Sequence, residues 1–123
     1  MLTQEHSQTA RDFLLASDRE FDAGDILQGS EKLWGAAAHA VMAVAQQRGW
    51  RFSDHRALRT AADRLADELR EPILASNFSV AEKFHANFYH DFMQDFEIPG
   101  DREQVRYFVE SVLSLPELSS EGH

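Results

Sequence analysis

Apolar residues recur at helical spacing over most of the chain, and the first such pattern covers residues 4–23. The positions that share one face of this predicted helix are Ala10, Phe13, Leu14 and Phe21. Gly24 is a typical residue at the end of a helix, and Asp25 is a typical first cap of the next one. The pattern therefore predicts one helix over residues 4–23 and a turn directly after it.

A second helix is predicted over residues 26–48, with Gly49 as its C-terminal stop. From Leu33 to Ala45 the only polar side chain is His39, so this helix is apolar on all sides. That pattern is typical of a central helix with neighbours on several faces. Gly35 and the alanines leave little side-chain thickness, so we expect the neighbouring helices to approach closely.

Three further helices follow from caps and apolar stripes. Ser53 or Asp54 is expected to cap the third, Ser79 the fourth and Asp101 the fifth. Prolines at 72, 99 and 116 are expected where helical patterns end. No segment alternates with a period of two, so strands are not expected.

The fourth helix carries a ladder of phenylalanines spaced four residues apart, which we expect to be buried. Its members are Phe84, Phe88, Phe92 and Phe96. These patterns predict an all-α, up-and-down bundle of four to five helices. We expect a single domain over residues 1–116 and a frayed tail over residues 117–123.

Charge and composition exclude several classes of protein. The 123 residues include 21 acids and 12 bases, for a net charge of −9, which disfavours a general nucleic-acid-binding protein. With no cysteine, the chain has neither a disulfide nor a thiolate site. The polar N-terminus does not resemble a secretory signal, and the apolar run of residues 33–45 is too short to span a bilayer. We therefore expect a cytoplasmic protein without a membrane segment.

Positive charge is concentrated between residues 48 and 64, where five arginines face two aspartates and leave a local charge of +3. If this junction is a ligand site, Arg48, Arg51 and His55 should converge on one concave surface near the start of the third helix. The further candidate ligand residues are Arg56 and Arg59. Guanidinium groups and helix amides together bind phosphate or carboxylate. The alternative is that these arginines form ordinary ion pairs with surface acids.

His39 is a further candidate, because it is the one polar residue of an apolar helix. We expect a neutral ring inside the bundle, since a charged imidazole among alanines meets a large desolvation penalty. The alternative is that His39 faces a polar cavity and contacts a ligand.

Glu82 and His85 form a Glu-x-x-His pair, the spacing found in di-iron helical bundles. Such sites need a second pair and two more glutamates, and the chain has no second Glu-x-x-His. A helical metal–oxygen enzyme is therefore a weaker alternative, and we expect neither a metal nor a cofactor.

The segment from Gly24 to Trp50, followed by the SDHRAL of residues 53–58 and FHANFYHDF of residues 84–92, resembles small stand-alone prokaryotic members of the HEPN superfamily. The resemblance covers roughly residues 10–114. It depends on the Gly-Asp turn before an alanine-rich helix, the Gly-aromatic turn after it, and the histidine that starts the next helix.

The resemblance implies a helical bundle that is a homodimer and acts as a toxin–antitoxin component, a nucleotidyltransferase partner, or a nucleotide- or RNA-linked protein. Ribonuclease members use an arginine followed, after four to six residues, by a histidine. Arg48 and His55 satisfy that spacing, so the alternative is a metal-independent endoribonuclease that uses these two residues. Gly49 after Arg48 departs from the motif, and for this reason we favour a binding or interaction module over an enzyme.

Overall fold

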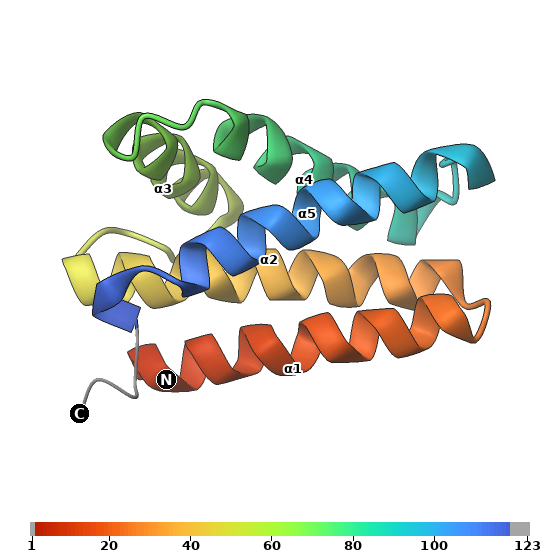
Figure 1. Ribbon diagram of the computed structural model, residues 1–123, viewed down its shortest axis with the longest axis horizontal. Coiled ribbons are helices and arrows are strands. Elements are labelled where there is room, and N and C mark those ends of the chain that lie inside the picture. Colours follow the sequence, from red (N-terminus) through yellow and green to blue (C-terminus); the bar gives the residue numbers. More distant parts are fainter. Residues whose placement is uncertain (1, 119–123) are drawn as a thin grey trace.

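The computed structural model describes residues 2–118 and is all-helical within that range (Figure 1). Its α-helices are α1 (Thr3–Asp22), α2 (Ile26–Arg48), α3 (His55–Glu68), α4 (Ile73–His90) and α5 (Ile98–Leu113). Two short 3₁₀ helices lie at Asp95–Glu97 and Pro116–Leu118. The prediction of an all-α bundle is confirmed.

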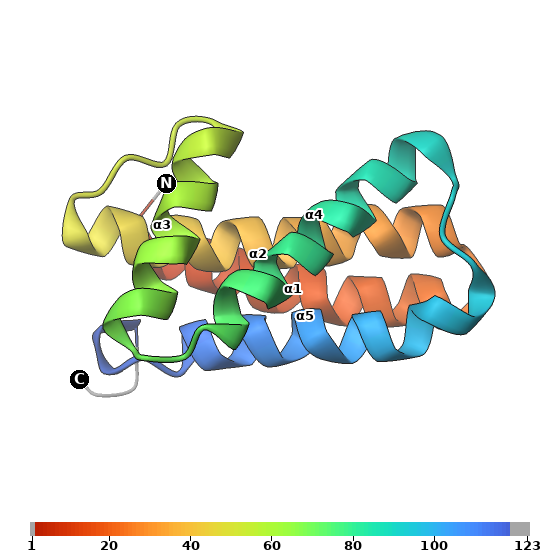
Figure 2. The ribbon, with the colours of Figure 1, turned by 90° about the horizontal axis from the view of Figure 1, so that it is seen from above.

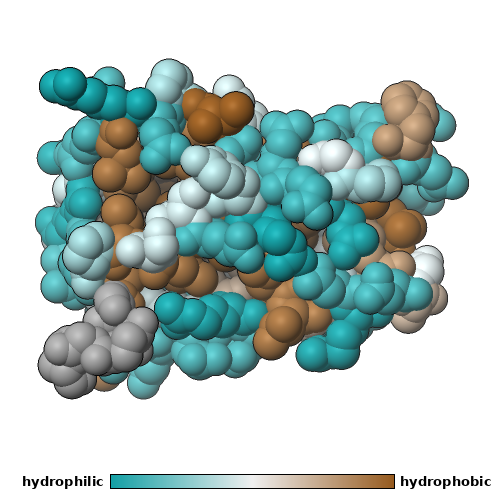
Figure 3. All heavy atoms as spheres, in the orientation of Figure 1, coloured by the Kyte–Doolittle hydropathy of each residue, from teal (hydrophilic) through white to brown (hydrophobic). Residues whose placement is uncertain are grey.

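The long helices alternate in direction, and α2 lies between the others (Figures 1 and 2). α1 and α2 form an antiparallel pair, α5 runs parallel to α2, and α4 crosses α2 obliquely. The short helix α3 lies across the C-terminal end of α2 (Figure 2). On the face shown in Figure 3 most of the surface is polar, and apolar residues form narrow patches. Within the described residues, no helix is long and apolar enough to cross a membrane.

The turns on either side of α2 are where the sequence predicts them. Gly24 and Gly49 both have positive φ, at 86° and 71°, a conformation that glycine adopts without strain. The Asp25 carboxylate accepts a hydrogen bond from the backbone N–H of Gln28 at 3.1 Å, and so caps α2. The Asp54 carboxylate caps α3 in the same way, through the N–H of Ala57 at 2.8 Å.

Two of the predicted caps are wrong, because prolines start helices here rather than end them. α4 begins at Ile73, directly after Pro72, so Ser79 lies inside it and its hydroxyl donates to the carbonyl of Ala75 at 3.3 Å. α5 begins at Ile98 with a proline in its first turn, so Asp101 lies inside the helix. Proline is well tolerated in a first turn, because the N–H that it lacks has no intrahelical partner there.

The prediction that the whole phenylalanine ladder is buried is also wrong. Phe84 is fully buried, whereas Phe92 and Phe96 are 45 % and 84 % exposed. α4 ends at His90, and Asp91 takes a left-handed conformation with φ 48°. The chain then leaves the helical path, so the spacing of four no longer keeps these side chains on one face.

The chain after α5 is packed as far as it is described. Leu118 is buried, and the carboxylate of Glu117 accepts a hydrogen bond from Nε of Arg48 at 2.7 Å. The rest of the tail that we predict to be frayed, residues 119–123, lies outside the described residues.

The α1–α2 pair is packed so closely that two glycines of α2 lie against aromatic rings of α1. A Cβ on Gly29 would stand 2.8 Å from ring atoms of Phe21, and one on Gly35 would stand 3.1 Å from the ring of Phe13. The Phe21 ring is itself held, because it packs edge-on against Phe84 with centroids 6.0 Å apart. The prediction of close approach along α2 is therefore confirmed.

Gly29→Ala should lower the free energy of unfolding by about 1–3 kcal/mol, because the added methyl group overlaps a ring that cannot move freely. Urea denaturation followed by circular dichroism measures this. Gly100→Ala in α5 is the matched control, since its Cβ meets no atom within 4 Å, and it should leave stability unchanged or raise it slightly. Equal stability of the two variants would contradict the role of the close approach.

Candidate functional site

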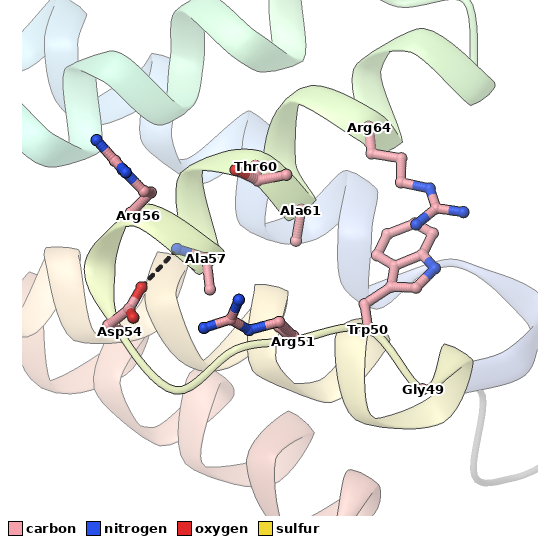
Figure 4. A pocket seen from close by; sticks show the side chains of 9 residues that line it. All are labelled: Gly49, Trp50, Arg51, Asp54, Arg56, Ala57, Thr60, Ala61 and Arg64. Atoms are coloured by element: carbon pink, nitrogen blue, oxygen red, sulfur yellow. Dashed lines mark hydrogen bonds between the residues drawn. The ribbon is translucent and has the colours of Figure 1, made fainter.

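A pocket of about 420 Å³ lies between the loop that follows α2 and the outer face of α3 (Figure 4). We call it the arginine pocket. Its lining residues are Gly49, Trp50, Arg51, Asp54, Arg56, Ala57, Thr60, Ala61 and Arg64. Three arginines and one aspartate supply its charged groups, so the pocket is basic although the protein is acidic.

The loop is held by the end of α2 and by the indole of Trp50. The backbone N–H of Trp50 donates to the carbonyl of Ala45 at 2.8 Å. This hydrogen bond belongs to the C-terminal cap of α2, in which Gly49 has the left-handed conformation. The guanidinium groups of Arg64 and Arg48 lie 4.3 Å and 5.0 Å from the Trp50 ring centroid. These cation–π contacts join the loop to α3 and to α2.

Two arginines of the pocket are available to a ligand. Arg51 and Arg56 are exposed, and among the described residues neither takes part in an ion pair. Arg64 is partly engaged, with Nε 3.5 Å from a carboxylate oxygen of Glu68. The Asp54 carboxylate is occupied by capping α3. In Figure 4 the Arg51 side chain extends from the loop toward the side of the pocket where Asp54 lies, the Arg56 side chain points away from the other lining residues, and the guanidinium beside the indole is that of Arg64. An unpaired arginine next to an apolar lining suits an anion with an apolar part.

Arg51 and Arg56 both line this pocket, with the Arg56 side chain pointing away from Arg51 (Figure 4), whereas neither Arg48 nor His55 is part of the lining. Arg48 is bound by Glu68 and Glu117. Burial lowers the pKa of Arg48, but the hydrogen bonds and charges of Glu117 and Glu68 outweigh this and leave the pKa raised. The predicted pair Arg48 and His55 is therefore divided between different contacts.

His55 instead belongs to a second cluster, formed where α2, α3 and α4 meet. Its ring and that of His85 stack on Trp34, each with its centroid 4.9 Å from that of the indole. The two imidazole centroids are 6.1 Å apart. Rings on opposite faces of the indole would be separated by much more, so both imidazoles lie over the same face. We call this group the histidine–tryptophan cluster.

Each imidazole of the histidine–tryptophan cluster donates to a glutamate. His55 Nε2 lies 2.7 Å from Oε2 of Glu82, and His85 Nδ1 lies 2.8 Å from Oε1 of Glu31. The predicted ligand residue Arg59 is also here, with its guanidinium 2.9 Å from Oε1 of Glu82. Both residues of the Glu-x-x-His motif are thus hydrogen-bonded to other side chains. Within residues 2–118, no three His, Asp or Glu side chains are arranged to hold a metal ion.

His39 is partly buried, and its partner is His6 of α1. The two Nδ1 atoms are 3.0 Å apart, so one ring must donate and the other accept. Burial lowers the pKa of His39. Burial and then the charge of His39 lower the pKa of His6, against an opposing effect of Glu5. Both rings are therefore neutral near pH 7, and His39 does not line the arginine pocket.

Sequence reasoning missed several residues of these sites. Thr60 and Arg64 follow Arg56 at intervals of four residues. This spacing places all three on one face of α3, so the sequence could have indicated that Thr60 and Arg64 belong to the same site. Neither the contact of His6 with His39 nor that of Trp34 with His85 has a sequence signal. Those pairs are made by packing between helices.

Over the described residues, the fold and the pocket define a small helical protein with a basic pocket beside α3. A family model described as the archaeal PaREP1/PaREP8 family matches residues 5–109, and the chain belongs to this family. The match extends from α1 into α5, so it includes both the arginine pocket and the histidine–tryptophan cluster. A comparison with curated proteins found no match, and a comparison with solved structures found none either.

The His6–His39 pair should make the protein less stable as the pH falls below about 6.5, the pKa of a histidine in the unfolded chain. Because both pKa values are lowered in the folded state, the unfolded state binds protons first. Stability is thus complete above this pH and decreases below it, by at most about 1.4 kcal/mol per pH unit for each histidine.

Urea denaturation at several pH values above the range in which carboxylates titrate measures this effect. The double variant His6→Gln/His39→Gln is the control, since it keeps polar side chains but removes both titrating groups. Its stability should change less over the same range than that of the wild type. The same pH dependence in both proteins would contradict the assignment.

Proposed function

We propose that the protein is a dimeric, HEPN-like helical binding module whose arginine pocket holds the phosphate groups of a nucleotide. The observation that carries this proposal is the pocket itself, where Arg51 and Arg56 have no acidic partner among the described residues. Five of the eight other arginines form ion pairs, namely Arg48, Arg59, Arg64, Arg102 and Arg106. Unpaired arginines in the lining of a hollow favour a ligand of opposite charge.

The chemistry of the lining favours a nucleotide over a bare anion. Guanidinium groups bind phosphate oxygens in a bidentate manner, while Trp50, Ala57 and Ala61 supply an apolar surface for a base or sugar. The net charge of −9 repels a long nucleic acid, which favours a mononucleotide or a short RNA end.

The HEPN resemblance extends the proposal to partners. Proteins of that kind work with a nucleotidyltransferase or an antitoxin, and either is a candidate partner of the dimer. The gene next to this one would identify such a partner.

The metal-independent endoribonuclease remains the alternative function. It requires Arg48 to hold a phosphate while His55 moves a proton. In the single chain Arg48 is neutralised by two carboxylates and His55 is bound to Glu82, so the geometry supports binding more than cleavage. RNA cleavage that persists in a metal chelator and is lost in His55→Ala would favour the alternative.

Arg51→Ala should weaken binding of ADP by about tenfold or more. A hydrogen bond to a charged group contributes about 1.5–3 kcal/mol, which corresponds to at least that factor in Kd. Isothermal titration calorimetry measures the effect, which should decrease as salt is added. Arg56→Ala should behave in the same way.

Arg19→Ala is the matched control, because Arg19 is an exposed arginine at the far end of α1. It removes the same charge and should leave ADP binding unchanged. Adenosine, which lacks phosphate, should bind far more weakly than ADP. Equal binding of adenosine and ADP, or no binding of either, would contradict the proposal.

A further inference from the structure

The segment after α4 exposes more aromatic surface than any solvated turn requires. Residues 91–96, DFMQDF, contain two Asp-Phe pairs, and we call them the acidic aromatic segment. Phe96 is 84 % exposed, Phe92 is 45 % exposed, and Tyr89, two residues before the segment, is also exposed. Large apolar side chains clustered in water typically mark an interaction surface.

This segment is held in place rather than loosely attached. The buried side chain of Asn87 accepts hydrogen bonds from the backbone N–H groups of Phe92 and Met93, each at 2.8 Å. The amide nitrogen of Asn87 donates to Ser30 of α2 at 3.2 Å, and Met93, which lies between the two exposed phenylalanines in the sequence, is buried. The phenylalanines are therefore presented outward by a fixed backbone, which lowers the entropy lost on binding.

The charges of the segment indicate what kind of surface it fits. Asp91 and Asp95 are exposed, and within residues 2–118 neither forms an ion pair. Two such segments facing each other would bring like charges together, which disfavours contact between identical surfaces. The complementary surface must be basic and must contain an apolar hollow for a phenyl ring.

The arginine pocket has both properties. Its volume of about 420 Å³ accommodates a phenyl ring, its lining includes Ala57 and Ala61, and Arg51 and Arg56 of that lining form no ion pair among the described residues. We propose that the acidic aromatic segment of one chain docks into the arginine pocket of a second copy, with Phe96 inserted and Asp95 paired with an arginine. This inference rests on the proposed binding pocket and names the contact that makes the protein a dimer.

The two surfaces lie too far apart on one chain to contact each other within it. The acidic aromatic segment lies at one end of the long axis and the loop of residues 49–54 lies at the other (Figures 1 and 2). An antiparallel pair of chains makes the contact twice and so forms a closed dimer. In this closed dimer the partner's segment fills each arginine pocket, so the nucleotide of the proposed function binds the monomer, and ADP should shift the equilibrium from dimer toward monomer.

Sedimentation velocity over a range of protein concentrations tests the contact. The wild type should be a dimer, and Phe96→Ala should raise the dimer dissociation constant by about tenfold or more, as expected for a central aromatic anchor. Leu15→Ala removes another exposed apolar side chain, 58 % exposed and located in α1, and should change nothing. Arg51→Glu, which alters the pocket instead of the segment, should weaken the dimer as Phe96→Ala does.

A mixture of Phe96→Ala and Arg51→Glu is the sharpest test. In a dimer of either variant alone, both contacts are altered. In a mixed dimer, the segment of the Arg51→Glu chain meets the intact pocket of the Phe96→Ala chain, so one of the two contacts is intact. The mixture should therefore dimerise more strongly than either variant alone. Contact between two identical surfaces would not give this result.

A monomeric wild type, a dimer unaffected by Phe96→Ala, or a mixture no stronger than its components would each overturn the inference. ADP binding to monomeric Phe96→Ala tests the pocket separately. If that variant is monomeric and does not bind ADP, the nucleotide proposal fails while the docking contact stands. If ADP binds but Phe96→Ala remains a dimer, the docking contact fails alone.

Discussion

The small side chains of α2 allow α1 to approach so closely that aromatic rings of α1 lie directly against the α2 backbone. A methyl group at Gly29 would overlap Phe21, and α2 has alanine at most of its other buried positions. The bulk of this core is supplied by the neighbouring helices, whose rings fill the space that the alanines leave. Each of the other four α-helices packs against α2. The position of α2 therefore also determines where α3 and the loop before it form the arginine pocket.

An excess of acid decides which arginines remain available. Arg48 and Arg59 each contact two carboxylates and connect helices, so they act as structural cross-links. Arg51 and Arg56 lie on the loop and on the outer face of α3, where no acidic side chain of the described chain reaches them. The arginines of residues 48–64 therefore fall into a group that cross-links the fold and a group without ion-pair partners among the described residues.

The errors in the predictions from sequence all occur where a helix begins or ends. A proline ends one helix or begins the next, and only the packing of α4 and α5 decides which. The spacing of the phenylalanines continues in the sequence beyond His90. The helix nevertheless ends there, and the side-chain oxygen of Asn87 accepts hydrogen bonds from the backbone N–H groups of Phe92 and Met93 in the new chain direction. A side chain four residues further on then faces solvent instead of the core.

The sequence by itself determined the helical class, the bounds of α2, the cap of α3 and the concentration of arginine near residue 50. These features depend on interactions within a few residues along the chain, namely periodicity, capping and the positive φ of glycine. Only the tertiary structure decided that His55 stacks on Trp34, that His39 faces His6, and that Phe96 is exposed. Such contacts join residues distant in sequence, and their partners are selected by how helices pack against one another, which no local pattern encodes.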